Sequence, residues 1–202
     1  MRTLRGDLIL ASHNTGKLRE FSALLADWPV RVVSAAERDL PEPPETGTTF
    51  AENARIKAHA ACRSTGLPAL SDDSGIEVDA LGGAPGVHTA DWAEMPSGGR
   101  DFLRAMTRTR DEIEMAGAPL PTPARFRATL CLAWPDGTDE LFEGVVEGSF
   151  VWPPRGDEGF GFDPCFVPAG QDRRFGEMTV AEKAPYSHRA RAFAAFAARM
   201  DG

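Results

Sequence analysis

The stretch "DLILASHNTGK", residues 7–17, constrains the fold more than any other part of the chain. Its apolar half predicts a buried strand, and its polar half predicts a turn that opens an amphipathic helix. A strand that passes through a short polar turn into a helix is typical of α/β proteins, many of which bind phosphate at the helix start. The P-loop pattern is nevertheless absent, because Ala11 replaces its first Gly and Leu18 its Ser or Thr.

Similar patterns alternate along the rest of the chain. They predict strands at 30–35, 67–73, 76–81, 124–134, 139–151 and 165–168, and helices at 50–66, 99–115 and 188–200. Capping boxes at Thr49–Glu52 and Thr179–Glu182 mark two helix starts, and Ser187 is placed to cap the last helix. No repeat or linker interrupts this order, so the sequence predicts a mixed α/β fold in a single domain, residues 1–202.

Composition and charge exclude several classes of protein. The 202 residues are 42% hydrophobic and 26% charged, an ordinary globular balance. The net charge of −8 repels nucleic acid and anionic membranes, so neither is an expected partner. Three widely spaced cysteines without a CxxC pair argue against disulfides and zinc, and they fit buried small side chains. No apolar run has the length of a signal peptide or a membrane span, which predicts a cytoplasmic protein.

The turn from Ser12 to Lys17 is the first candidate site. A turn at a helix start presents backbone N–H groups and the positive end of the helix dipole. Ser12, Asn14 and Thr15 add neutral polar groups, and Lys17 adds a charge. Two interpretations fit these residues equally well on their own: an anion site, and a plain turn capped by Asn14 or Thr15.

Carboxylates supply the next candidates. Asp72 and Asp73 end an apolar strand, where α/β proteins place functional groups, and their side chains should point to opposite faces. Glu45 precedes a helix on which Asn53 and Lys57 share one face, and it could reach a metal. Carboxylates near one site bind Mg²⁺ or act as a base. The alternatives are a solvated Asx turn at "DDSG" and a surface amphipathic helix.

Two further stretches, "GFGFDP" and "EKAPYSHRAR", combine rings with charges. In the first, residues 159–164, an exposed Phe ring would stack on a base while Asp163 accepts from a ring N–H. In the second, Lys183, His188 and Arg189 lie at the start of a helix, where cations oppose the helix dipole. Their placement indicates a bound anion or the edge of a base. A buried hydrophobic turn and a solvated cluster of charges are the alternatives.

Lysine usage singles out the same stretches. Only three of the 22 basic residues are lysines, and all three, Lys17, Lys57 and Lys183, fall in these candidate segments. An Arg-rich chain that keeps Lys at these positions indicates a need for a compact point charge.

Together these motifs resemble one family, the inosine/xanthosine triphosphate pyrophosphatases, which clear noncanonical purine nucleotides. "SHNTGK", "ETGTTFAENARIKA", "LSDDSG", "GGAPGV", "GFGFDP" and "EKAPYSHR" occur in the family's order between residues 8 and 192. The resemblance implies a mixed central sheet flanked by helices, with two lobes that enclose an active-site cleft, in a homodimer. It also implies Mg²⁺-dependent hydrolysis of ITP, dITP and XTP to the monophosphate and pyrophosphate.

The resemblance also implies roles by position. Glu45 and Asp73 correspond to metal ligands, with Asp73 as the general base and Asp72 as the fallback for that role. The triphosphate loop corresponds to Ser12, His13, Asn14, Thr15, Gly16 and Lys17. The remaining substrate-binding positions are Lys57, Ser74, Phe160, Gly161, Phe162, Asp163, Lys183, His188 and Arg189.

Three positions depart from the family's usual pattern. His13 is bulky where Gly is common, Asp91 stands where Arg is frequent, and Phe162 lacks the polar atom of the usual Tyr or Trp. Two other functions stay open: a pyrophosphatase for modified pyrimidine nucleotides, and a non-catalytic nucleotide-binding regulator. The two carboxylate sites argue against the regulator.

Overall fold

The computed structural model describes residues 3–200, and its chain divides into two compact units. Unit 1 comprises Met1–Asp73, Ala128–Gly144 and Arg189–Gly202, and unit 2 comprises Ser74–Arg127 and Val145–His188. The chain therefore passes from one unit to the other within two of the candidate segments, after Asp73 and after His188. Whether these two units form the single domain expected over residues 1–202 is not tested by this division, so the single domain stays a prediction.

One sheet contains six strands in the order β2-β1-β3-β4-β5-β6. β1 pairs in parallel with β2 and β3, whereas β5 pairs antiparallel with β6, so the mixed α/β class is confirmed. The strands are β1 (Gly6–Leu10), β2 (Val30–Ser34), β3 (Ala69–Val78), β4 (Thr122–Ala133), β5 (Asp139–Phe150) and β6 (Phe166–Pro168).

The strand β3 is longer than the sequence predicted. The polar residues 71–74 do not end it, and β3 continues to Val78, where two separate strands were expected. The polar groups are tolerated inside the strand because they have partners: the Ser71 hydroxyl donates to the Ala54 carbonyl oxygen at 2.6 Å. Gly75 allows a close approach, since a Cβ there would lie 2.4 Å from the Gly86 carbonyl oxygen. The aspartate pair therefore lies within a strand and not at its end.

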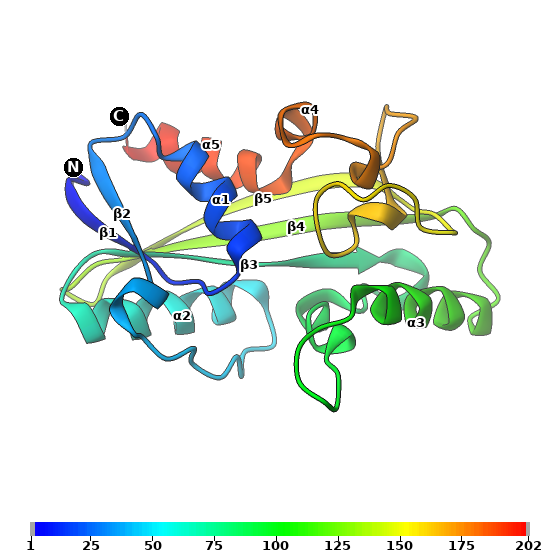
Figure 1. The fold of residues 1–202 in the computed structure, drawn as a ribbon, viewed down its shortest axis with the longest axis horizontal. Coiled ribbons are helices and arrows are strands. Elements are labelled where there is room, and N and C mark those ends of the chain that lie inside the picture. The colour runs from blue at the N-terminus through cyan, green and yellow to red at the C-terminus, as the bar shows by residue number, and fades with distance from the viewer. Residues whose placement is uncertain (1–2, 201–202) are drawn as a thin grey trace. The chain divides into compact units, whose positions relative to one another are not determined.

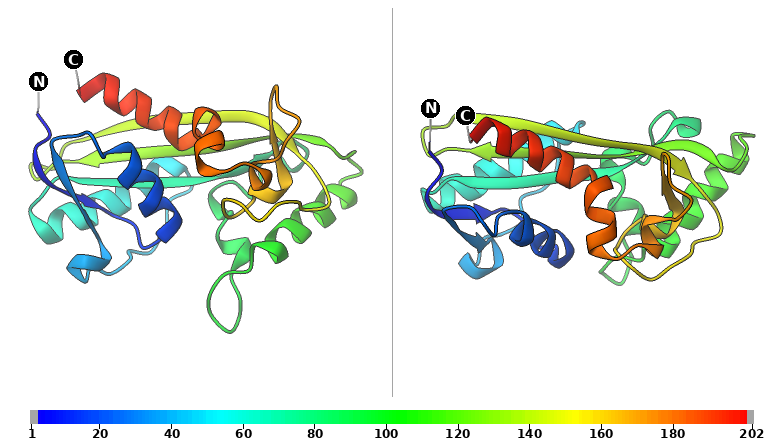
Figure 2. Two further views of the ribbon diagram at one scale, coloured as in Figure 1. Left: turned by 45° about the horizontal axis from the view of Figure 1, so that its top comes forward. Right: turned by 90° about the horizontal axis from the view of Figure 1, so that it is seen from above.

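Helices cover both faces of the strands in unit 1 (Figures 1 and 2). α1 (Thr15–Leu24) and α5 (His188–Met200) lie on one face, and α2 (Phe50–Thr65) lies on the other. The alternation of side chains along a strand explains this layering. Leu8 and Leu10 of β1 pack in one cluster with Phe196 of α5, whereas Ile9 packs in a second cluster with Ala58 of α2.

Unit 2 is built around phenylalanine rings. It contains α3 (Phe102–Met115) and the single turn α4 (Val180–Lys183). Its fully buried rings are Phe150, Phe162, Phe166 and Phe175. Short 3₁₀ turns occur along the chain at Ala36–Arg38, Asp79–Leu81, Gly86–His88, Asp91–Ala93, Asp163–Cys165, Phe175–Glu177 and Ala184–Tyr186. Between residues 3 and 200, no helix is both long and apolar enough to cross a membrane.

Several helix ends follow the sequence closely. Thr49 and Glu52 form the predicted capping box of α2, and Gly66 ends that helix with a φ of 69°. The second box, Thr179 with Glu182, opens α4. α3 begins later than expected because the Asp101 side chain accepts from the backbone of Leu103 and Arg104 and caps the helix there. The cap by Ser187 stays a prediction.

The cysteines generate the first testable prediction. All three are buried and free, as the sequence predicted, and burial raises the pKa of Cys131 and of Cys165 to about 12. Because the thiolate is the reactive form, we expect no thiol of the native protein to react with DTNB at pH 8. All three should react in guanidinium chloride. A thiol that reacts rapidly without denaturant would contradict this packing.

Candidate active site

The two adjacent aspartates of β3 serve separate ion pairs, since neighbouring side chains on a strand point to opposite faces. Asp72 has only 1% of its side chain exposed, and its Oδ2 lies 2.7 Å from Lys17 Nζ. The same oxygen accepts from Arg189 Nε at 3.3 Å. Arg189 also donates to Glu20 Oε2 at 3.1 Å, so two carboxylates hold its guanidinium.

These partners keep Asp72 ionised. Burial alone would raise the pKa of Asp72, but the charges of Lys17 and Arg189 outweigh burial and hold it well below its usual range. Burial lowers the pKa of Lys17, and the Asp72 charge opposes that change. Asp72 is therefore a fixed negative charge and a poor proton acceptor.

Asp73 lies in a different group, centred on the ammonium of Lys57. Lys57 Nζ donates to Asp73 Oδ1 at 2.8 Å and to Glu45 Oε1 at 2.8 Å. Burial raises the pKa of Asp73 although Lys57 and Lys17 oppose it, and the nearby Glu45 charge adds to the rise. Burial would lower the pKa of Lys57, but the two carboxylates outweigh it and raise that pKa. The group thus holds a charged lysine and a carboxylate that is more basic than usual.

One carboxylate oxygen of this group could bind a cation. Asp73 Oδ2 is buried and has no hydrogen-bond partner among residues 3–200, which is costly for a polar atom. Within the same residues no three His, Cys, Asp or Glu side chains converge as a complete metal cage. Mg²⁺ commonly takes one or two protein carboxylates and fills its other positions with water and phosphate oxygens. Glu45 and Asp73 fit that requirement.

The loop from Ser12 to Lys17 is largely occupied by its own contacts. Asn14 Oδ1 accepts from the N–H of Gly16 at 2.9 Å and of Lys17 at 3.1 Å, which confirms Asn14 as the cap of α1. The Ser12 hydroxyl accepts from the Asn14 N–H at 3.2 Å. These three amides are therefore bound within the loop, contrary to the free N–H groups of an open anion site. The Lys17 ammonium and the Thr15 side chain remain as groups through which a phosphate could be held.

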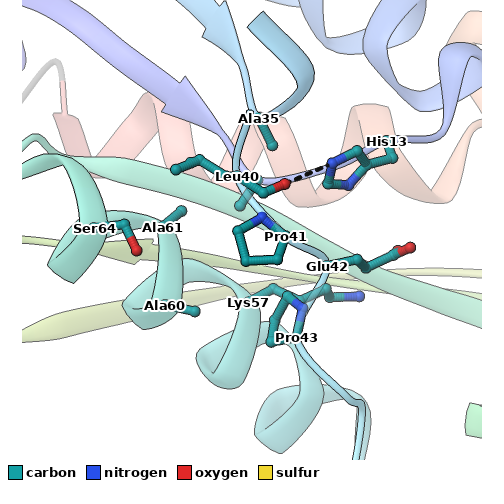
Figure 3. Close-up of a pocket in the computed structure, with 11 residues that line it drawn as sticks. His13, Ala35, Leu40, Pro41, Glu42, Pro43, Lys57, Ala60, Ala61 and Ser64 are labelled. Carbon is teal, nitrogen blue, oxygen red and sulfur yellow. Dashed lines mark hydrogen bonds between the residues drawn. The ribbon is translucent and has the colours of Figure 1, made fainter. Parts of the chain in front are cut away.

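His13 points toward another loop. Its Nε2 lies 3.0 Å from the Leu40 carbonyl oxygen, beside a pocket of about 80 Å³ whose wall includes Lys57 (Figure 3). The segment after Leu40 leads to Glu45, and its far end is fixed where Asn53 Oδ1 accepts from the Gly47 N–H at 2.8 Å. Only Gly fits at 47, because a Cβ there would lie 2.6 Å from Asn53 Oδ1.

A second cluster, in unit 2, is centred on Asp163. Asp163 Oδ2 accepts from Lys183 Nζ at 2.6 Å and from the Phe160 N–H at 2.9 Å. Both charged side chains are buried. Gly159 has a φ of 72°, and a Cβ there would lie 2.1 Å from Asp163 Oδ2, which explains the first Gly of "GFGFDP".

The rings of unit 2 divide between core and surface. Phe162 is 1% exposed and packs in the core, so the predicted stacking of its ring on a substrate has no exposed face to use. Phe160 is half-buried, and Lys183 Nζ lies 5.5 Å from its ring centre. His188 is buried and stacks on Phe126, with ring centres 4.9 Å apart and planes at 11°.

The structure separates residues that the sequence placed together. His188 ends unit 2, whereas Arg189 begins the last part of unit 1 and binds Asp72 and Glu20. Ser74 is half-buried in unit 2. Asp91, at the position that departs from the family pattern, is exposed and accepts from His88 at 2.8 Å.

Two contributing residues escaped sequence reasoning. Glu20 follows Lys17 by three residues on α1, and such i, i+3 spacing could have marked it as part of the same cluster. Phe126 carried no signal beyond strand alternation, so its stacking on His188 could not have been found from the sequence.

Comparison with known proteins identifies the family. Residues 8–199 match the Ham1 family. The chain belongs to the Ham1 family. Among its relatives, the dITP/XTP pyrophosphatase of Ruegeria pomeroyi is 62% identical over 196 residues, which are 96% of each chain. That of Bartonella quintana is 56% identical over 92% of this chain and 91% of its own.

Solved structures of the Ham1 family share the fold. A HAM1 protein from Coxiella burnetii matches with a TM-score of 0.87 and 34% identity over 96% of this chain and 98% of its own. The nucleoside-triphosphatase, or dITP/XTP pyrophosphatase, of Mycobacterium abscessus matches with a TM-score of 0.73 and 38% identity over 94% and 98%. The family resemblance drawn from the motifs is thereby confirmed.

The Lys57 pairs generate a second prediction. Replacing Lys57 with Met should lower the free energy of unfolding by about 3–5 kcal/mol, because the buried Asp73 loses its cation. Arg55→Met on the same helix is the control. Its pair with Asp139 is half-exposed and should contribute about 0–1 kcal/mol. Urea unfolding of both variants measures the difference, and equal losses would contradict the role given to Lys57.

Proposed function

We propose that this protein hydrolyses noncanonical purine nucleoside triphosphates, namely ITP, dITP and XTP, to the monophosphate and pyrophosphate. The names of its relatives support this substrate class. The single structural observation that carries the proposal is the Lys57 ammonium between Glu45 and Asp73, with Asp73 Oδ2 buried and without a hydrogen bond among the described residues. This is a site for a cation and for a reacting water.

The reaction transfers the nucleotidyl group, that is the α-phosphorus with its attached nucleoside, to water. The water oxygen bonds to the α-phosphorus, and the bond to the bridging oxygen breaks with its electron pair leaving on pyrophosphate. Asp73 takes the proton of the water, since its raised pKa makes it a better base than an ordinary aspartate. Asp72, with its lowered pKa, is the weaker candidate for that role.

Glu45 and Asp73 would hold the metal ion, which we propose to be Mg²⁺. When bound, Mg²⁺ supplies positive charge to the phosphate oxygens and acidifies a bound water. Lys57 fixes both carboxylates, and Lys17 presents a second positive charge close to Asp72. The loop Ser12–Lys17 would orient the triphosphate through this lysine and the Thr15 hydroxyl.

The cluster of unit 2 would recognise the base. Hypoxanthine and xanthine carry a 6-oxo acceptor, for which Lys183 and His188 offer donors. Adenine carries an amino donor in its place, which would face these buried donors instead of accepting from them, and such a mismatch favours discrimination. Arg189 is held by Asp72 and Glu20, so we assign base selection to Lys183 and His188 in preference to Arg189. A cytoplasmic homodimer is also proposed, the dimer from the family alone and the location from the sequence.

An NTP panel with pyrophosphate detection tests the substrate class. With Mg²⁺, we expect kcat/KM for ITP and XTP at least about a hundredfold above ATP, and EDTA should abolish turnover. Preference for a modified pyrimidine triphosphate would instead favour the alternative pyrophosphatase. Nucleotide binding without Mg²⁺-dependent pyrophosphate release would favour the non-catalytic regulator, and either result overturns the proposal.

Replacement of Asp73 tests the base. Asp73→Asn should lower kcat by about 10²–10⁴-fold, because the amide cannot accept the proton, while the Kd for ITP measured in Ca²⁺ changes by less than about tenfold. Asp79→Asn, whose carboxylate pairs with Arg125 outside this cluster, is the matched control and should keep full activity. Substantial turnover by Asp73→Asn would contradict the assignment.

A further inference from the structure

We propose that His13 is a positioning residue for the metal site: its hydrogen bond to the Leu40 carbonyl sets the place of Glu45. The inference rests on the proposed function for the identity of the metal-binding carboxylate. It concerns the position where this chain carries a bulky ring in the triphosphate loop.

His13 donates the hydrogen bond to Leu40. A backbone carbonyl oxygen only accepts, so Nε2 of His13 must carry the proton in the 3.0 Å contact with Leu40. Figure 3 shows the ring turned toward the Leu40 carbonyl along the wall of the small pocket. The side chain therefore joins the start of α1 to the segment that carries Glu45.

Leu40 is held in place by hydrogen bonds at both of its backbone groups. Its N–H donates to the Ala35 carbonyl at 3.0 Å, so with His13 both backbone groups of Leu40 are bound. Among the residues that the structure describes, Leu40 is the last one before Glu45 with a backbone hydrogen bond. The position of Leu40 therefore defines where the free segment begins.

The segment between Leu40 and Glu45 is stiff because it is rich in proline. The sequence between Leu40 and Glu45 is Pro41-Glu42-Pro43-Pro44. Proline fixes φ near −65° and lacks an N–H, so such a segment behaves as a semi-rigid spacer that needs no anchoring bonds of its own. A displacement of Leu40 is consequently passed on to Glu45, whose carboxylate must meet Lys57 at 2.8 Å.

His13 acts on Glu45 through Leu40 and not through contact with the substrate. His13 uses Nε2 for Leu40, and the far end of the segment is fixed independently by the bond between Gly47 and Asn53. Loss of the His13 contact should thus free the segment that carries Glu45 at its Leu40 end, while its Gly47 end stays fixed. The site should still form, but with weaker affinity for a divalent cation.

The experiment measures Mn²⁺ binding to the nucleotide-free protein by calorimetry. For His13→Asn we expect a Kd for Mn²⁺ raised about threefold to tenfold, the effect of losing one net hydrogen bond. His13→Gln should stay within about twofold of the wild type. The Gln amide nitrogen occupies the place of Nε2 along the side chain, whereas the Asn amide corresponds to Nδ1 and falls short of Leu40.

Turnover supplies the second readout. The Mg²⁺ concentration that half-activates ITP hydrolysis should rise in His13→Asn in parallel with the Kd for Mn²⁺. His88→Ala removes an exposed histidine elsewhere in the chain, and it should change neither quantity. Because calorimetry needs no substrate, failure of the NTP panel and failure of this inference are separate results.

Three outcomes would overturn the role. The Kd for Mn²⁺ could be the same in His13→Asn and wild type. The Asn and Gln variants could weaken metal binding equally, which would indicate a general effect on the loop. Finally, kcat at saturating Mg²⁺ could fall while the Kd for Mn²⁺ stays constant, which would place His13 on the phosphates.

Discussion

The ammonium of Lys57 holds together the part of unit 1 on which the proposed chemistry depends. It binds Glu45 from a loop and Asp73 from β3, both at 2.8 Å, so one charge fixes a loop, a helix and a strand. Its place is set by the start of α2, where the capping box of Thr49 and Glu52 fixes the first turn. Asn53 and Lys57 then share a helix face, so the residue that holds Gly47 and the residue that holds Glu45 act together.

The three lysines of the chain follow one pattern. Lys17 pairs with Asp72, Lys57 with Asp73 and Lys183 with Asp163, and each of these aspartates is buried. A buried ion pair adds little net stability compared with apolar packing, because both charges are desolvated. The pairs are therefore better explained by function: each keeps an ionised carboxylate in place. Most arginine pairs, in contrast, are more exposed, such as Arg31 with Asp7, whereas Arg189 also binds the buried Asp72.

Sequence patterns predicted those features of the site that depend only on residues close together in the chain. The capping box at Thr49 and the opposite faces of Asp72 and Asp73 depend on neighbours within a few residues, and both were found. The bond between Asp72 and Arg189 joins positions 117 residues apart, which no local pattern encodes. The stretch "SHNTGK" illustrates a different limit. The backbone N–H groups that would bind an anion are the same groups that a capping side chain binds, and the structure shows that Asn14 occupies those of Gly16 and Lys17.

Hydrogen bonds and ion pairs within the protein limit what a bound triphosphate can gain. Most charged and polar groups of the unit 1 cluster already have protein partners, so a triphosphate would exchange these contacts for its own and gain only the difference. Such preorganisation limits the reorganisation needed during the reaction. Asp73 Oδ2 differs, because it is buried and has no hydrogen-bond partner among residues 3–200. A cation that binds there forms a new contact without breaking one, and for that reason metal binding, more than phosphate binding, should be sensitive to the placement of Glu45.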